Sequence, residues 1–245
     1  MSSAGRGQAE VRLRPPAPKW EPPPTSDPER IRELKEALRL PEPVCTLLSI
    51  RGRSAVEEAK RFLRPRMEQL SDPTLLADGL IAASRIAKAI SDDEKIFIHG
   101  DYDVDGICAT ALLTQWVRSL GGSVTPFVPH RVRDGYDFSE NGLAEARAVG
   151  ASLVVTVDCG TMAHETIAKA RGIGIDVIVT DHHTVGGDSP GAFAVVNPQR
   201  PDCQYPDKGL CGTAVAFRLG ELVGRQLGVD LAELYAAPPP KAAQT

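Results

Sequence analysis

Residues 95–106 read KIFIHGDYDVDG. The run Ile96-Phe97-Ile98 is short and apolar, as is typical of a buried β-strand. Aspartates at positions 101, 103 and 105 follow it, and an apolar segment of helical length then extends over 106–120 to the stop signal Gly121-Gly122. A strand that leads through a polar loop into a helix begins a βαβ unit. This stretch therefore predicts an α/β protein with polar residues at a strand end.

The same alternation continues along the chain. It predicts strands at 123–128, 153–157, 177–179 and 192–196, and helices at 75–90, 139–149, 162–171 and 213–228. Strands and helices in this order form a mostly parallel sheet flanked by helices. Upstream, apolar residues recur at helical spacing over 28–40, and short basic helical pieces follow over 44–70. We expect an α/β fold preceded by a small helical region.

This pattern divides the 245 residues into four parts. Residues 1–28 contain seven prolines and should form a disordered arm. A helical region over 29–75 and the α/β domain over 76–235 follow, and residues 236–245 form an Ala/Pro-rich tail that should also be disordered.

The composition excludes several classes of protein. A hydrophobic content of 42% with 24% charged residues suits a globular core, and no apolar run approaches the length of a transmembrane helix. The N-terminus has no apolar signal region, and the five cysteines form no C-x-x-C pair, so we expect a reduced, cytoplasmic protein. The net charge of −4 combines a basic N-terminal part with an acidic remainder, which suits either a polyanion partner or ordinary surface charge.

Polar clusters follow three of the predicted strands. The first runs from His99 to Gly106, the second is Asp158-Cys159-Gly160-Thr161, and the third is Thr180-Asp181-His182-His183-Thr184. The carboxyl ends of parallel strands share one edge of a sheet, so these side chains should converge. Five carboxylates in one place require cations. Oxygen ligands with one or two imidazoles favour manganese or magnesium, and two such ions would clamp a phosphate ester for hydrolysis. The helix N-terminus at Gly106 would seat the phosphate.

Each cluster also has a simpler interpretation. The first resembles half of a calcium loop, but Leu112 stands where that loop needs glutamate, so calcium is excluded. It also fits a turn that caps the following helix, and the two histidines could be solvated loop residues. The spacing of Cys203 and Cys211 does not match a structural zinc site.

The three clusters resemble motifs I, II and III of the DHH phosphoesterases, and within them the RecJ-type single-stranded-DNA-specific exonucleases. Arg133-Asp134-Gly135-Tyr136, Val196-Asn197-Pro198 and Leu210-Cys211-Gly212 are also RecJ-like, and the resemblance covers roughly residues 28–230. It implies a 5′→3′ exonuclease of recombination and repair that acts on single-stranded DNA and uses two manganese or magnesium ions.

The resemblance also implies roles for single residues. The metal ligands would be His99, Asp103, Asp105, Asp158 and His182, with Asp158 bridging the ions and Asp101 outside direct coordination. His183 would contact the scissile phosphate or protonate the leaving oxygen, and Asp181 would orient its loop. Arg131 and Arg133 would contact the DNA backbone, unless they are solvated loop residues.

The chain departs from the family pattern in three ways. Asp137 stands where the family usually has glycine, and Cys211 with Thr213-Ala214 replaces small residues before the last helix. The family's fourth motif, a further metal-binding aspartate, is absent, as are the C-terminal DHHA1 and OB-like domains, which we expect to be lost or encoded separately. Two alternatives therefore remain open: a DHH hydrolase that acts on short oligonucleotides or small phosphates, and a truncated chain inactive by itself.

Overall fold

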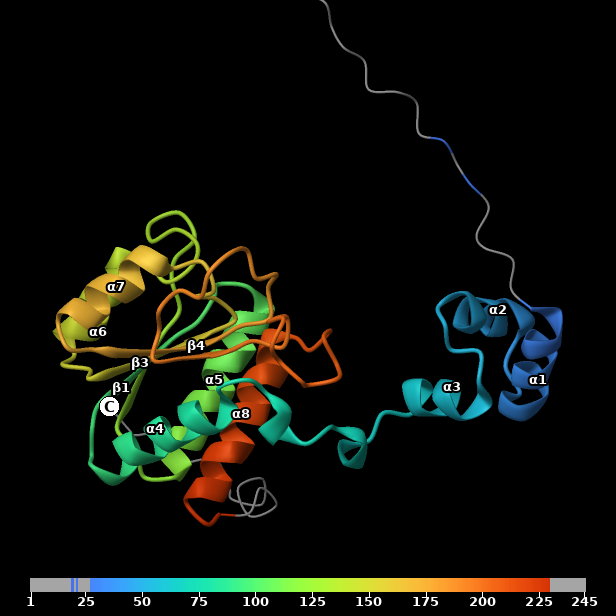
Figure 1. Ribbon diagram of the computed structural model, residues 1–245, viewed down its shortest axis with the longest axis horizontal. Coiled ribbons are helices and arrows are strands. Elements are labelled where there is room, and N and C mark those ends of the chain that lie inside the picture. Colours follow the sequence, from blue (N-terminus) through green and yellow to red (C-terminus); the bar gives the residue numbers. More distant parts are fainter. Residues whose placement is uncertain (1–18, 20, 22–26, 230–245) are drawn as a thin grey trace, which may run out of the picture. The chain divides into compact units, whose positions relative to one another are not determined.

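The computed structural model describes residues 27–229 together with Lys19 and Glu21 (Figure 1). The chain forms two compact units, Met1–Leu70 and Ser71–Thr245. The arm predicted over 1–28 lies outside the described residues except for Lys19, Glu21, Asp27 and Pro28, and the tail predicted over 236–245 lies wholly outside them.

The first unit is helical. It contains α1 (Pro28–Leu38), α2 (Glu42–Ile50), α3 (Val56–Leu63) and the 3₁₀ turn η1 (Met67–Gln69). The Asp27 side chain caps α1 by accepting a hydrogen bond from the Glu29 amide at 2.9 Å. The helix ends two residues before the predicted position, because Arg39 takes a left-handed conformation. The small core of this first unit consists of Leu34, Cys45, Leu48 and Ala59.

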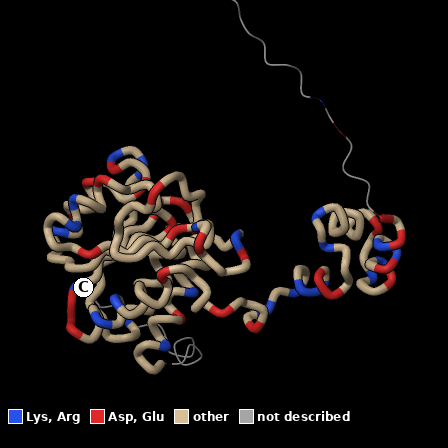
Figure 2. Tube along the Cα trace, in the orientation of Figure 1, with Lys and Arg blue, Asp and Glu red and all other residues tan. Residues whose placement is uncertain are grey.

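Basic and acidic residues are mixed along α1 (Figure 2). Arg30 pairs with Glu33 and Arg32 with Glu29, each three residues apart on an exposed face. Such exposed pairs contribute little stability. They do place a carboxylate beside Arg30 and Arg32, so part of the positive charge that the sequence gives this region is paired.

The second unit is built on a parallel sheet, as the sequence predicts. Its five described strands are in the order β2-β1-β3-β4-β5 and all pair in parallel. They are β1 (Ile96–His99), β2 (Val124–Phe127), β3 (Leu153–Val157), β4 (Asp176–Thr180) and β5 (Ala194–Val196). The side chains of successive residues alternate between the two faces, and both faces of the central strands are buried, which explains their continuous apolar sequences.

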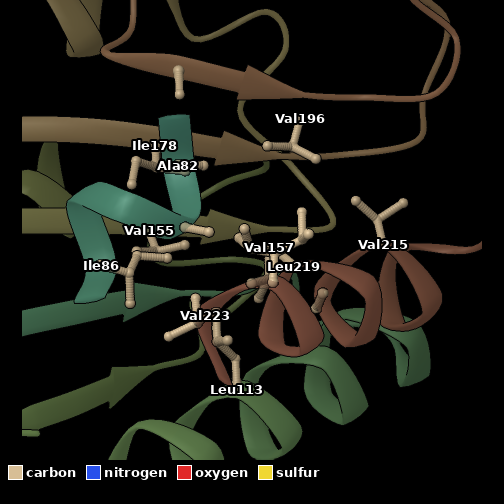
Figure 3. Packing of buried hydrophobic residues seen from close by; sticks show 14 of the residues in the cluster. Ala82, Ile86, Leu113, Val155, Val157, Ile178, Val196, Val215, Leu219 and Val223 are labelled. Carbon is tan, nitrogen blue, oxygen red and sulfur yellow. The ribbon is translucent and has the colours of Figure 1, made fainter. Parts of the chain in front are cut away.

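Helices cover the two faces of this sheet (Figure 1). The helices α4 (Gly79–Ser91), α5 (Val104–Ser119) and α8 (Gly212–Gln226) share one core with Ile96, Ile98 and Val155. The helices α6 (Glu140–Ala148) and α7 (His164–Gly172) share the other core with Phe97, Val154 and Val177. Figure 3 shows the first core, in which Leu219 of α8 lies beside Val157 of β3.

One predicted helix is wrong in its first turn. Helix α4 begins at Gly79 instead of residue 75, because Asp78 has a positive φ of 57° and a separate 3₁₀ turn, η2 (Pro73–Leu75), precedes it. The other helices and strands of this unit begin and end within three residues of their predicted positions. No helix in the described part of the chain is long and apolar enough to cross a membrane.

Close backbone contacts set the positions of α5 and α8. A Cβ atom at Gly106 would lie 2.5 Å from the carbonyl oxygen of Asp101, and one at Gly220 would lie 1.3 Å from the Trp116 ring. Only glycine allows these approaches. These approaches let the start of α5 pack against the loop after β1, and let α8 pack closely against the Trp116 ring of α5.

Candidate metal centre

The loops after β1, β3 and β4 bring acidic and histidine side chains together at this edge. Ligand atoms of Asp101, Asp103 and Asp158 lie within 4.8 Å of one another, and so do those of Asp158, His182 and His183. Asp158 belongs to both groups. The three clusters that the sequence places after three different strands therefore meet around one carboxylate.

Asp158 is buried, with 1% of its surface exposed, and has a left-handed φ of 63°. His182 Nε2 lies 3.0 Å from its Oδ1 atom, but without hydrogen-bonding geometry, so this buried oxygen has no hydrogen-bond partner. Burial and the nearby charges of Asp105 and Asp103 raise the pKa of Asp158 to about 8. A bound cation would supply the missing partner and stabilise the carboxylate form, so these residues fit a divalent metal.

The N-terminus of α8 packs directly against these carboxylates. A Cβ atom at Gly212 would lie 2.5 Å from Asp158 Oδ1. The Asp105 carboxylate accepts hydrogen bonds from the Gly212 amide at 2.7 Å and from the amide and hydroxyl of Thr213 at 2.8 and 2.5 Å. Burial raises the pKa of Asp105, but these hydrogen bonds outweigh it and the net shift is downward. Asp105 thus binds a helix N-terminus, and it is in neither of the two groups.

The sequence interpretation missed Gly212 and Thr213 as partners of this site. Its only signal was their position before the last helix, where the chain departs from the family pattern. Their role became visible through contacts with Asp105, which lies more than 100 positions earlier in the chain.

Asp181 organises the loop after β4. Its Oδ1 atom accepts hydrogen bonds from the amides of His182 and His183 at 2.7 and 3.1 Å, and its Oδ2 from the Thr161 amide at 3.1 Å. The Nδ1 atom of His183 lies 2.7 Å from the same carboxylate. Burial alone would lower the pKa of His183, but the interaction with Asp181 outweighs it and raises the pKa. With these contacts, Asp181 holds the backbone of both histidines and the ring of His183.

His99 lies outside both groups. Its ring is fully buried, with the Phe127 and Phe138 rings 5.3 and 5.2 Å away between centroids. Its Nε2 atom has no hydrogen-bond partner and faces Gly142, where a Cβ atom would lie 2.5 Å away. Burial lowers the pKa of His99 to about 4, so the imidazole is neutral at pH 7.

Asp101 and Asp103 occupy different environments. Asp101 is buried, its Oδ1 has no hydrogen-bond partner, and it lies in the first group although we expected it outside direct coordination. Asp103 is the N-cap of α5 and accepts hydrogen bonds from the amides of Asp105 and Gly106 at 2.9 and 3.0 Å. The Gly106 amide, expected to bind phosphate, is thus already used within the protein.

The two arginines expected to contact DNA differ in their surroundings. Arg133 makes two hydrogen bonds to its neighbour Asp134, at 2.8 and 2.9 Å. Arg131 lies over the Tyr102 ring, 5.3 Å from its centroid. Tyr102 in turn contacts Tyr136, whose ring lies 6.4 Å from that of His183. These two tyrosines, to which the sequence interpretation assigned no role, connect the arginine loop to the histidines.

A parallel sheet whose strand ends bring carboxylates and histidines to one aspartate defines an α/β protein with a candidate metal centre. Residues 95–238 match the DHH family, N-terminal domain, and the chain belongs to this family.

Its curated relatives include RecJ exonucleases. The chain is 37% identical over 210 residues to the single-stranded-DNA-specific exonuclease RecJ of Bacillus subtilis, covering 86% of this chain and 27% of that protein. It is 39% identical over 197 residues to RecJ of Escherichia coli, covering 78% and 33%. The chain therefore spans about a third of the length of these relatives or less.

Solved structures agree with this assignment. RecJ from Thermus thermophilus in complex with Mn²⁺ matches with a TM-score of 0.64 and 30% identity, over 88% of this chain and 29% of that one. A second exonuclease RecJ bound to manganese matches with a TM-score of 0.57 and 36% identity, over 67% and 40% of the two chains. RecJ from Thermus thermophilus has also been solved with Mg²⁺.

Proposed function

We propose that this chain provides the metal centre of a phosphodiesterase that degrades single-stranded DNA, the substrate given in the name of its RecJ relatives, and that it does so from the 5′ end, as the resemblance implies. The observation that carries the proposal is Asp158, a buried residue that belongs to both groups of ligand atoms and whose Oδ1 accepts no hydrogen bond. The RecJ relatives support the choice of substrate.

The donor set suits two manganese or magnesium ions. We assign Asp103, Asp158 and His182 as metal ligands, with Asp158 between the two sites. Asp101 is the remaining member of the first group of ligand atoms, and His183 is the remaining member of the second. Asp105 and His99 stay in the proposed ligand set as the resemblance implies, although α8 holds Asp105 and His99 is buried among aromatic rings. When bound, such ions neutralise charge on the phosphate and activate water.

The protein's own residues orient the reacting groups. Because the Nδ1 atom of His183 faces Asp181, its Nε2 atom is the one available to the leaving oxygen of the phosphodiester. Asp181 acts by holding this ring and its loop. The Arg131–Tyr102–Tyr136 series leads to His183 and offers a cation and aromatic faces to the DNA strand. Arg133 would reach the DNA backbone only by giving up hydrogen bonds to Asp134.

We also propose a cytoplasmic location. All five cysteines lie in the described part of the chain and none forms a disulfide, as expected in a reducing compartment.

The test is nucleotide release by the full 245-residue chain. A 5′-labelled single strand with Mn²⁺ should yield labelled mononucleotides, Asp158→Asn should abolish their release, and Asp93→Asn should leave it unchanged. Asp93 is an exposed aspartate at the opposite end of β1, which makes it a matched control. Release that persists in Asp158→Asn would refute the role of Asp158. Hydrolysis of short oligonucleotides or pyrophosphate without attack on long strands would instead indicate a small-phosphate enzyme.

A further inference from the structure

Asp137 has a backbone conformation that few residues other than glycine adopt. Its φ is +72°, and it lies in the loop between β2 and α6. Asp and Asn tolerate this region because their short polar side chains bond to nearby backbone groups. Asp137 does so through Oδ1, which accepts a hydrogen bond from the Phe138 amide at 2.8 Å.

The same oxygen makes a second, longer-range contact. It accepts a hydrogen bond from the Gly160 amide at 2.6 Å. Gly160 lies after β3, whereas Asp137 lies after β2, and β1 separates these two strands in the sheet. The Asp137 carboxylate therefore joins two loops that strand pairing does not connect.

The turn that receives this hydrogen bond carries Asp158. Asp158 and Gly160 both have positive φ, 63° and 108°. The turn is held by hydrogen bonds from the Asp158 amide to the Thr180 carbonyl at 2.9 Å and from the Thr156 hydroxyl to the Cys159 carbonyl at 2.8 Å. Gly160 is buried, so loss of the Asp137 carboxylate would remove the hydrogen-bond partner of a buried amide.

We propose that Asp137 is a positioning residue that, through the Gly160 amide, holds the Asp158 carboxylate in the orientation needed to bind divalent metal. The inference rests on the metal site in the proposed function and extends it to a residue that ligates nothing. Groups that orient metal ligands from outside typically change metal affinity by about 10- to 100-fold when they are removed.

Three variants of the full chain test this role. Asp137→Gly removes the acceptor and relieves the left-handed strain, Asp137→Asn keeps an Oδ1 acceptor, and Asp93→Gly is the matched control. Asp93 also has a positive φ, 53°, but lies in the turn before β1 at the far end of the sheet. Calorimetric titration with Mn²⁺ should show binding at least about tenfold weaker in Asp137→Gly. Asp137→Asn should restore most of the lost affinity, and Asp93→Gly should bind like the wild type.

Two titration results would overturn the proposal. One is Mn²⁺ affinity in Asp137→Gly within about twofold of the wild type, given the expected loss. The other is an equal loss in Asp137→Asn, which would show that charge and not the hydrogen bond is responsible.

Hydrogen exchange in the metal-free wild type provides a test that needs no variant to fold. The Gly160 amide should be protected, and exchange as fast as in an open loop would overturn the proposal. Failure of the proposed hydrolysis is distinguishable, because it would appear as Mn²⁺ binding without nucleotide release and would leave the exchange and titration results standing.

Discussion

Replacement of Asp158 by asparagine should make the metal-free protein more stable, increasingly so as the pH rises. In the folded wild type, burial and the neighbouring Asp105 raise the pKa of Asp158 from 3.8 to about 8. Below pH 4 this carboxyl is protonated in both the folded and the unfolded state. Between pH 4 and 8 the unfolded state releases a proton that the folded state retains, so wild-type stability falls as the pH rises through this window.

The magnitude follows from the two pKa values. Each pH unit in the window costs the folded state about 1.4 kcal/mol, which gives an upper limit of about 4 kcal/mol at pH 7. Relaxation around buried charges reduces such effects, so we expect about 2 kcal/mol at pH 7. Asparagine does not titrate, and the difference in unfolding free energy between Asp158→Asn and the wild type should therefore grow from pH 4 to pH 8.

Urea unfolding of chelator-treated protein measures this difference. Trp116 is buried in the second unit, so its fluorescence reports on the unit that carries Asp158 once Trp20 is replaced by phenylalanine. Mn²⁺ should then stabilise the wild type more than Asp158→Asn, because a ligand that binds the folded state shifts unfolding by mass action. A difference in unfolding free energy that stays constant from pH 4 to 8 would refute the argument that Asp158 is a destabilising buried carboxyl.

Three further substitutions test other parts of the structure. Gly220→Ala should destabilise the second unit by about 3 kcal/mol in urea unfolding, because the added methyl group overlaps the Trp116 ring; a loss below about 0.5 kcal/mol would contradict this packing. Asp27→Ala should destabilise the first unit by about 1 kcal/mol through loss of the α1 cap, as thermal circular dichroism would show, whereas Asp27→Asn should retain most of the stability. Asp181→Asn should lower the pKa of His183 in the metal-free protein, measured by NMR titration, because the carboxylate that stabilises its charged form is gone; an unchanged pKa would exclude that contact.

The sequence was sufficient to predict the architecture of the second unit. Apolar runs of strand length alternate with helices of ordinary length, and this order leaves few arrangements besides a parallel sheet with helices on both faces. It was also sufficient to predict that the residues after β1, β3 and β4 meet, because parallel strands end at one edge. The centrality of Asp158 could be inferred only through the resemblance to a known family.

The partners of each carboxylate depended on the tertiary structure. The sequence does not distinguish Asp105, whose oxygens bind the N-terminus of α8, from Asp158, whose Oδ1 has no hydrogen-bond partner. It likewise gave no indication that His99 is enclosed by aromatic rings or that Asp137 reaches the Gly160 amide across β1.

The physical reason is the range of the interactions. Periodicity and turn chemistry act over a few residues, and they determine where strands and helices begin and end. By contrast, hydrogen bonds to the carboxylates of Asp105 and Asp137 and from the backbone amide of Asp158 join segments that are distant in the chain. These segments meet only once strand order and helix packing are established. The sequence by itself determined which chemical groups reach this edge of the sheet, and the tertiary structure decided which of them remain free to bind a metal.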